Sequence, residues 1–207
     1  MTGTGGLTLL FVFIYLVGCA QKATYIDLVY PPESEIENDT ITAVDTDSTV
    51  MASDAVLLDV QDDRANTIDV GRMYTGMFGE SYSELLTDQN VETWVFDAIV
   101  AEFGALGIDV LHAAGSAKTT GADDIRVSIK LLQARCAWDC DGEVMLAAVL
   151  TRTGKDAVVG EFPVDLSSEN WIWLKVQPTA EGVLGRALQM AVRQMLVEFE
   201  YASPNRE

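Results

Sequence analysis

The chain has 207 residues, of which 13 are Lys or Arg and 32 are Asp or Glu, so its formal net charge is −19. Proteins that bind nucleic acid or anionic headgroups use clusters of basic residues, and this charge balance therefore argues against both kinds of partner. The length suits one domain with a sizeable hydrophobic core and leaves little room for a second.

The N-terminal segment predicts an export signal that ends at a cysteine. The apolar run from Leu7 to Ala20 has 14 residues, whereas a helix that crosses a bilayer needs about 20. Leu16-Val17-Gly18-Cys19 resembles the lipobox of bacterial lipoproteins, in which the cysteine is lipidated and becomes the first residue. We therefore predict that residues 1–18 are a signal peptide and that Cys19 carries the lipid. An ordinary signal peptide and a tilted membrane anchor are the alternatives.

The lipid on Cys19 implies a location in the cell as well as a membrane anchor. Each buried methylene of an acyl chain contributes about 0.8 kcal/mol, and more than one chain gives stable anchoring. The next residue is Ala20 rather than an aspartate, which in the lipoprotein pattern implies export to the outer membrane. We expect the protein to be attached there by its lipid and to face the periplasm.

Residues 19–54 are expected to form the anchored N-terminus and an acidic tether. Between Lys22 and Arg64 there are eleven acidic residues and no basic residue. Residues 31–54 contain few large apolar side chains, so the sequence predicts a flexible, self-repelling segment, with a solvated surface loop as the alternative. The preceding TYIDLVY is a candidate edge strand. Residues 55–207 would then form a single domain.

The predicted domain begins with a strand and a helix. AVLLDVQDDR is a short apolar run that ends in acidic residues, as a buried strand does where it reaches a loop. Residues 65–86 are ambiguous. Thr87 or Asp88 can cap a following helix, which is expected to end near Gly104 or Gly107 and to be followed by the strand IDVLHA. Its apolar residues recur at helical spacing, at Val91, Val95, Ala98, Ile99 and Phe103.

The middle of the chain predicts an antiparallel meander of three strands. IRVSIKLLQARC and EVMLAAVLT form a hairpin whose turn lies between Cys136 and Cys140, and a third strand follows Gly154. A register shift of two residues would preserve the apolar face. The register that we favour pairs Leu131 with Met145, Ile129 with Ala147 and Val127 with Val149, and places all six on the face shared with Val158, Phe162 and Val164.

The last element is an amphipathic helix in TAEGVLGRALQMAVRQMLVEFE. Its apolar residues form one stripe, with Arg186, Gln189 and Arg193 mostly on the opposite side. Two such helices and a sheet with one apolar face predict an α+β fold, a two-layer sandwich with a mainly antiparallel sheet.

The order of these elements resembles the YajG-like family of bacterial outer-membrane lipoproteins. The resemblance rests on the lipobox, VLLDVQDDR, the helix VETWVFDAIVAEFGALGIDVL, the meander and the closing helix. It implies a periplasm-facing α/β domain anchored at Cys19, with no established reaction. Asp63 and Arg64 match the acidic residue and arginine at the strand end in that family. The cysteine pair and the acidic segment depart from the family pattern.

Cys136 and Cys140 are expected to form a disulfide. They flank a three-residue turn in a compartment that permits oxidation, and a tight hairpin can bring their Cα atoms within bonding range. Free thiols are the alternative. A redox-active pair is disfavoured because the spacing is C-x-x-x-C.

Trp171 and Trp173 in NWIWLKV are candidates for a partner surface. Residues two apart on an extended segment point the same way, and two indoles make a large amphipathic patch. We expect these two and Trp138 to dock a protein partner, because aromatic residues dominate interfaces. Burial of both indoles within the core is the alternative.

The sequence nominates no catalytic residue, metal site or cofactor. His112 follows an apolar strand and is better interpreted as structural. Asp139, Asp141 and Glu143 cluster at one turn but lack the rest of a calcium-binding loop. Motifs of nucleophilic, zinc or phosphate chemistry are absent from the sequence.

We therefore expect a non-enzymatic, lipid-anchored protein that binds or positions another component of the cell envelope. The alternatives are a carrier of a small ligand, with a cavity between helices and sheet, and an accessory subunit of an envelope lipid-transport machine. The expected partners are the membrane, through the lipid on Cys19, and an envelope protein.

Overall fold

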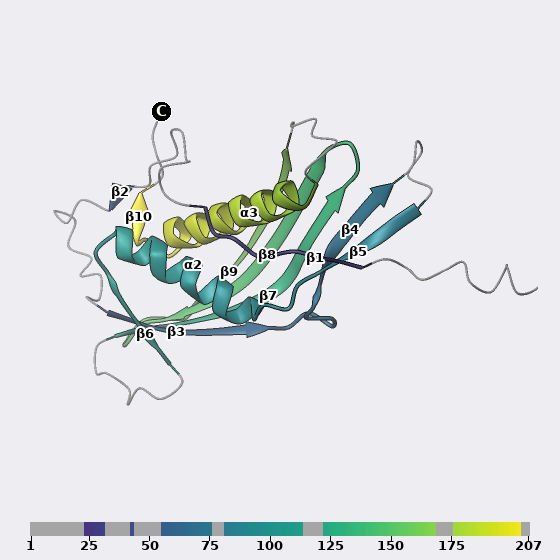
Figure 1. Cartoon of the computed structure of the whole chain (residues 1–207). Helices are drawn as coiled ribbons and strands as arrows, with labels where there is room; N and C mark the ends of the chain where they lie inside the picture. Colours follow the sequence, from purple (N-terminus) through teal and green to yellow (C-terminus); the bar gives the residue numbers. More distant parts are fainter. Residues whose placement is uncertain are drawn as a thin grey trace, which may run out of the picture.

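The computed structural model describes residues 23–31, 42–43, 55–75, 81–113, 122–168 and 176–203. Two long helices cover one face of an eight-stranded sheet, so the described part of the chain is a two-layer α+β sandwich (Figure 1). This confirms the predicted fold class.

The large sheet is mixed. Its strands are β1 (Thr24–Tyr25), β3 (Ala55–Asp62), β4 (Asp69–Thr75), β5 (Ser81–Leu86), β6 (Asp109–His112), β7 (Asp123–Cys136), β8 (Cys140–Thr151) and β9 (Val158–Ser168). β2 (Thr42–Ala43) and β10 (Ala202–Ser203) form a separate antiparallel pair. The helices are α2 (Val91–Ala105) and α3 (Val176–Glu198).

β7, β8 and β9 form the predicted antiparallel meander, but the predicted register holds only near the turn. Leu131 lies opposite Met145, as expected. A β-bulge between Ile129 and Leu131 then shifts the pairing by one residue, so that Ile129 lies opposite Leu146 and Val127 opposite Ala148. The predicted partners Ala147 and Val149 were therefore wrong.

The bulge also decides which side chains of the meander are buried. A shift of one residue moves a strand's side chains to the other face of the sheet. The buried residues of β7 therefore change from Val127 and Ile129 before the bulge to Leu132 and Ala134 after it. β8 alternates regularly and buries Val144, Leu146, Ala148 and Leu150, rather than the predicted Met145, Ala147 and Val149. Phe162 and Val164 of β9 are buried as predicted, whereas Val158 is 37% exposed.

β3 and β4 follow one another along the same edge of β7. β3 pairs in parallel with the first half of β7, up to Asp62 opposite Ile129, and β4 pairs in parallel with its end, from Gly71 opposite Ala134. The bulge in β7 lies in the interval between them. The long strand β7 therefore pairs along one edge with two shorter strands, first β3 and then β4.

Gly71 permits the close approach of β4 to β7. Its φ of 141° lies outside the range that side chains favour, and a Cβ built on it would lie 1.9 Å from the carbonyl oxygen of Ala134. A residue with a side chain cannot occupy this position without moving the backbone of one strand.

α2 is capped at both ends by local sequence. Asn90, rather than the predicted Thr87 or Asp88, is the N-cap, and its side chain accepts a hydrogen bond from the N–H of Thr93 at 2.9 Å. At the other end the N–H of Ile108 donates to the carbonyl of Phe103, and Gly107 has a φ of 75°. This is a Schellman motif, in agreement with the predicted end near Gly107.

α3 contributes the predicted apolar stripe to the core. Leu184, Leu188 and Met195 are fully buried, and the helix packs on β7, β8 and β9 while α2 packs on β3 and β6. Gln189 is an exception to the predicted pattern. It is 4% exposed rather than on a solvent-facing side.

The fold includes residues before the acidic segment. β1 pairs in parallel with β5, and Ile26 and Leu28 are buried in the core. The described fold therefore includes residues ahead of the predicted boundary at residue 55, within the segment TYIDLVY that was a candidate edge strand. The acidic segment connects two parts of one domain, and within it Thr42–Ala43 pair with Ala202–Ser203.

Candidate functional site

Three of the predicted site residues lie outside the described residues. They are the lipid-attachment residue Cys19 and the indole pair Trp171 and Trp173.

Cys136 and Cys140 close the hairpin of β7 and β8. Cys136 ends one strand, Cys140 begins the other, their Cα atoms are 4.0 Å apart, and a disulfide joins them. Both side chains are buried in the hydrophobic core. The three-residue turn between them is fixed further by a hydrogen bond of 2.7 Å from the N–H of Ala137 to the carbonyl of Asp139.

The turn holds Trp138 at the surface, where the side chain is 49% exposed. β4 ends beside it, since Met73 lies opposite Cys136. Tyr74 and Tyr82 are direct cross-strand neighbours on β4 and β5, with ring centroids 6.3 Å apart and exposures of 36% and 45%. The guanidinium of Arg72 lies 5.3 Å above the ring of Tyr82.

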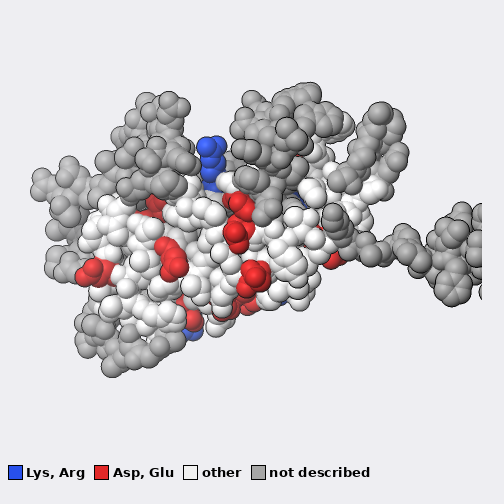
Figure 2. All heavy atoms as spheres, in the orientation of Figure 1, with Lys and Arg blue, Asp and Glu red and all other residues white. Residues whose placement is uncertain are grey.

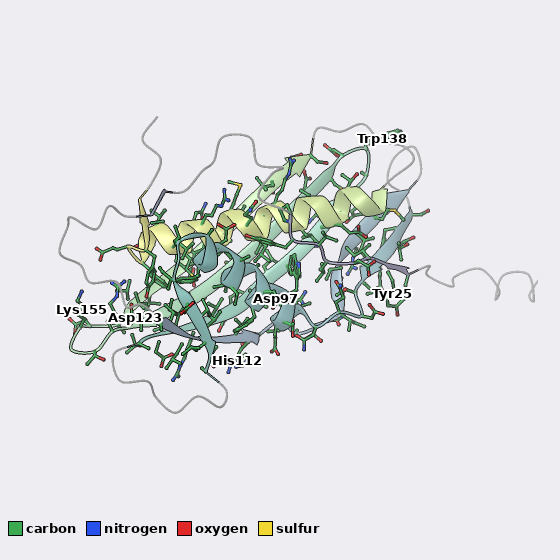
Figure 3. All side chains as sticks on the ribbon, turned by 60° about the vertical axis from the view of Figure 1, so that its left-hand side comes forward. Tyr25, Asp97, His112, Asp123, Trp138 and Lys155 are labelled. Atoms are coloured by element: carbon green, nitrogen blue, oxygen red, sulfur yellow. A yellow bond between two sulfur atoms is a disulfide. The ribbon has the colours of Figure 1, made fainter. Side chains whose placement is uncertain are left out.

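Tyr25 of β1 is 58% exposed and lies at the same end of the molecule as Trp138 (Figure 3). We call Tyr25, Tyr74, Tyr82 and Trp138 the aromatic end. Lys155 and Asp123 lie at the opposite end (Figure 3). Of these four residues only Trp138 was predicted from the sequence, because no spacing in the sequence connects tyrosines on three separate strands.

A buried carboxylate joins the two helices to the N-terminal segment. Glu102 of α2 is 7% exposed and accepts hydrogen bonds from three side chains. The donors are Tyr30 at 2.6 Å, Gln189 at 3.0 Å and Arg193 at 3.1 Å. Burial, followed by the hydrogen bond to the carboxylate, raises the pKa of Tyr30. Donors from the N-terminal segment and from α3 thus meet at one carboxylate of α2.

A second buried carboxylate joins the sheet to the end of α3. Asp123 of β7 accepts hydrogen bonds from the hydroxyl of Tyr201 and, at 3.1 Å, from Nε of Arg152. The same guanidinium donates to the carbonyl of Phe199 at 2.7 Å and lies 5.3 Å from the centre of the Tyr201 ring. Burial, followed by the hydrogen bond to Asp123, raises the pKa of Tyr201.

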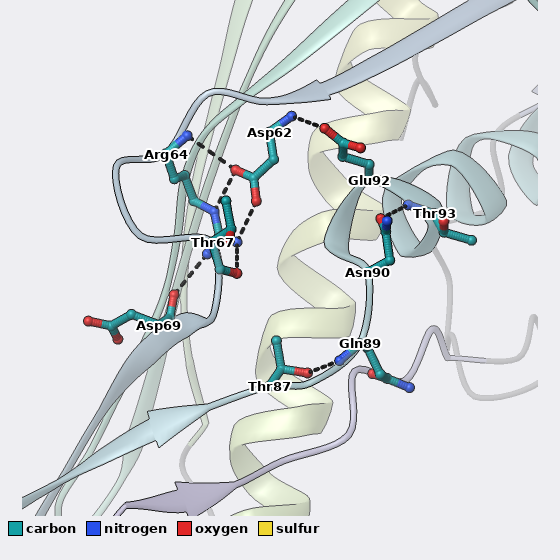
Figure 4. A network of polar contacts seen from close by, with 9 residues as sticks. All are labelled: Asp62, Arg64, Thr67, Asp69, Thr87, Gln89, Asn90, Glu92 and Thr93. Atoms are coloured by element: carbon teal, nitrogen blue, oxygen red, sulfur yellow. Dashed lines mark hydrogen bonds and ion pairs between the residues drawn. The ribbon is translucent and has the colours of Figure 1, made fainter. Parts of the chain in front are cut away.

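The resemblance to the YajG-like family pointed to Asp63 and Arg64, and the structure gives both a place in the loop between β3 and β4. Arg64 binds Asp62 and donates to the carbonyls of Thr67 and Asp69 (Figure 4). Asp63 instead accepts a hydrogen bond of 2.6 Å from Lys130, which lies at the bulge in β7. The N–H of Asp62 donates to Glu92 and so connects this loop to α2 (Figure 4).

These charged groups bridge separate elements of the fold. Glu102 and Asp123, the two buried carboxylates just described, each contact at least two elements distant in sequence. Removing one partner of such a buried contact leaves an uncompensated charge, which is strongly destabilising. Among the residues that the structure describes, no three His, Cys, Asp or Glu side chains lie close enough together to hold a metal ion.

The remaining candidates are at the surface. His112 ends β6 and its ring lies 4.9 Å from that of Phe96, which agrees with a structural role. Of the acidic residues near the disulfide, Glu143 forms an ion pair of 3.0 Å with Arg135. In the described part of the chain, neither helix combines the length and the apolar character that a transmembrane segment needs.

No protein-family model matches the chain, and no curated protein matches its sequence. Solved structures show distant likeness. A Xanthomonas campestris protein of the family DUF330 has 14% identity and a TM-score of 0.48, over 86% of this chain and 97% of its own. A minor lipoprotein from Acinetobacter baumannii has 7% identity and a TM-score of 0.38, over 75% of this chain and 98% of its own.

A lipoprotein from Neisseria meningitidis has 15% identity and a TM-score of 0.32, over 68% of this chain and 94% of its own. Bacterial lipoproteins are thus among the structural neighbours by name. Likeness this distant assigns no role, and membership of the YajG-like family stays a prediction.

Proposed function

We propose that this protein is a non-enzymatic lipoprotein of the bacterial cell envelope that is anchored through Cys19 and binds or positions another envelope protein. The observation that carries the proposal is the sequence Leu16-Val17-Gly18-Cys19. Its cysteine lies four residues before Ala23, the first residue that the structure describes. A lipidated Cys19 would therefore lie next to a folded edge strand rather than at the far end of a long tether.

The buried charges favour a binding role over a catalytic one. Glu102 and Asp123 each accept hydrogen bonds from side chains in other parts of the fold, and Arg64 binds Asp62 and two carbonyls close to it in sequence. An active site needs titratable groups that converge on a substrate, whereas these groups converge on one another.

The surface that we propose for the partner lies at the opposite end of the meander from the disulfide turn. Val159 is 70% exposed and Val158 is 37% exposed, both at the start of β9. β8 has 12 residues, and at about 3.4 Å per residue it separates this surface from the disulfide turn by roughly 37 Å. With the membrane at the end of the molecule that carries the disulfide turn, a partner docked at Val159 would not compete with it for space.

Fractionation of cells tests the anchor. We expect the wild-type chain to sediment with outer membranes and to carry acyl chains on Cys19 by mass spectrometry. The Cys19→Ser variant should lose both properties, because its net charge of −19 gives it no electrostatic attraction to a bilayer. An unmodified N-terminus in the membrane-bound wild type would overturn the anchor.

Photo-crosslinking in intact cells tests the binding role. A photoreactive residue at Val159 should give one discrete adduct with an envelope protein, and the same residue at Asp97, which is exposed on α2 in the helix layer, is the matched control. The adduct should weaken in the Cys19→Ser background, where the chain is no longer held near its partner. Equal, diffuse adducts at both positions would contradict a specific partner at this surface.

A further inference from the structure

We propose that the aromatic end, Tyr25, Tyr74, Tyr82 and Trp138, lies against the headgroup region of the bilayer that holds the lipid of Cys19. This inference rests on the proposed anchor and adds an orientation to it. The sheet would then stand with its aromatic end on the membrane and its β8–β9 turn directed away (Figure 3).

The reach of the chain supports this orientation. Cys19 and Ala23 are four residues apart, and four extended residues span at most about 14 Å. Ala23 directly precedes β1, which pairs with β5. A lipid on Cys19 therefore brings the edge of the sheet at β1 to within about 14 Å of the depth at which the lipidated residue sits.

The direction of β1 selects the end of the molecule that faces the bilayer. β1 runs parallel to β5, with Thr24 opposite Leu85 and Tyr25 opposite Leu86. The N-terminal end of β1, which leads back to Cys19, is therefore directed toward the start of β5. Tyr82 lies at that start, opposite Tyr74.

The exposed side chains at this end have the chemistry of a membrane interface. Tyr and Trp combine an apolar ring with a polar atom, and they are enriched at the level of the lipid headgroups. Trp138 and the three tyrosines are between 36% and 58% exposed. The disulfide between Cys136 and Cys140 fixes the turn that presents Trp138.

The charges at this end predict the kind of bilayer that fits. Arg72 pairs with Asp69 at 3.6 Å and Arg135 pairs with Glu143 at 3.0 Å, so neither cation offers an unpaired charge to an anionic headgroup. Acidic side chains are scattered over the face shown in Figure 2, where few basic ones are visible. The contact should therefore depend on the rings and favour zwitterionic headgroups.

The test measures the depth of single sites on the full, lipidated chain in phosphatidylcholine vesicles. Tyr82→Cys and Tyr25→Cys carry a fluorescent label at the aromatic end, and Lys155→Cys carries it at the opposite end. The two native cysteines of the domain are joined to each other and do not take the label. Iodide in the water and bromine on the acyl chains quench labels at the surface and within the bilayer, respectively.

We expect the labels at positions 25 and 82 to lose most of their quenching by iodide and to be quenched by brominated lipid, while the label at 155 behaves in the opposite way. Emission of the unlabelled wild type should be quenched by brominated lipid more than that of Trp138→Phe. This second measurement needs no label and leaves the tyrosines in place.

Two results would overturn the orientation, and they can be told apart. If the chain floats with the vesicles but positions 25, 82 and 155 are equally accessible to iodide, the anchor stands and the aromatic end does not contact the bilayer. A protein partner found bound to the aromatic end in cells would also overturn the orientation and leave the anchor in place. If the wild type does not float, the anchor and the orientation both fail.

Discussion

Arg64 binds the carboxylate of Asp62 through two hydrogen bonds, at 2.8 Å from Nε and 2.7 Å from Nη2. The two side chains are 7% and 5% exposed, and the guanidinium also donates to two loop carbonyls. The pair thus fixes the loop at which the chain leaves β3 and begins β4, on the same edge of β7.

Arg64→Ala should destabilise the protein by about 3–5 kcal/mol, because it leaves the carboxylate of Asp62 buried without its partner. Arg64→Lys should recover little, since an ammonium cannot make the paired contact to the carboxylate and reach both carbonyls. Urea unfolding followed by circular dichroism measures both. Arg126→Ala, at a side chain that is 72% exposed, is the control and should change stability by less than about 0.5 kcal/mol. Equal losses for Arg64→Ala and Arg126→Ala would contradict the structural role.

Two glycines three residues apart in α3 test how the N-terminal segment is held. A Cβ on Gly185 would lie 2.3 Å from the carbonyl oxygen of Val29, whereas a Cβ on Gly182 would meet nothing within 4 Å. Gly182→Ala should stabilise the helix by about 1 kcal/mol. Gly185→Ala should instead destabilise by about 1–3 kcal/mol, because the segment must move to make room.

Hydrogen exchange locates this effect. The N–H groups of Asp27 and Leu28 donate to Glu181 and Gln89, and both should exchange faster in Gly185→Ala than in Gly182→Ala. If the two variants protect these amides equally, the segment does not pack on α3 as described.

The buried tyrosines predict a loss of stability at high pH. The pKa of Tyr201 is higher in the folded state than the ordinary value of 10.0, first through burial and then through its hydrogen bond to Asp123. A raised folded pKa stabilises the fold below the unfolded value, and this contribution is lost as pH rises above about 10. The free energy of unfolding of the wild type should therefore fall above that pH, and Tyr201→Phe should show a smaller fall. Tyr25→Phe, at an exposed ring, is the control and should follow the wild-type profile.

The disulfide should contribute modestly to stability. It closes a very short loop, and the entropic model gives about 2 kcal/mol for a loop of this size. Urea unfolding of the wild type with and without dithiothreitol should show this difference, and the double variant Cys136→Ser/Cys140→Ser should be insensitive to the reductant. A loss of fold on reduction would mean that the bond does more than close the turn.

Much of the fold could be predicted from apolar periodicity. The strand at Ala55, the α2 and α3 stripes and the meander from Asp123 to Ser168 all follow from spacing and turn residues. The register of the meander could not be predicted from this periodicity. Leu131 and Leu132 are adjacent, and β8 is apolar at both odd and even positions, so alternation fits either face of the sheet. The bulge between Ile129 and Leu131 determines which residues of β7 and β8 pair beyond it.

The polar interior was harder to foresee. Glu102 follows Ala98 by four residues and Ile99 by three, and so occupies the buried stripe of α2. That position indicated a buried carboxylate. The groups that donate hydrogen bonds to Glu102 come from Tyr30 and from α3, and no local pattern in the sequence connects them to it. The contacts of Arg152 and Tyr201 with Asp123 likewise join distant segments.

The arrangement of β3 and β4 along one strand constrains the order in which the molecule can assemble. β7 and β8 are joined by a short turn and can pair quickly. β3 and β4 pair with β7 over long separations in sequence, with Val56 opposite Asp123 and Gly71 opposite Ala134, so these pairings form more slowly. A polypeptide emerges with its N-terminus first. Both β3 and β4 are therefore made before β7, the strand with which they pair, and they lack this neighbour until Asp123–Cys136 has emerged.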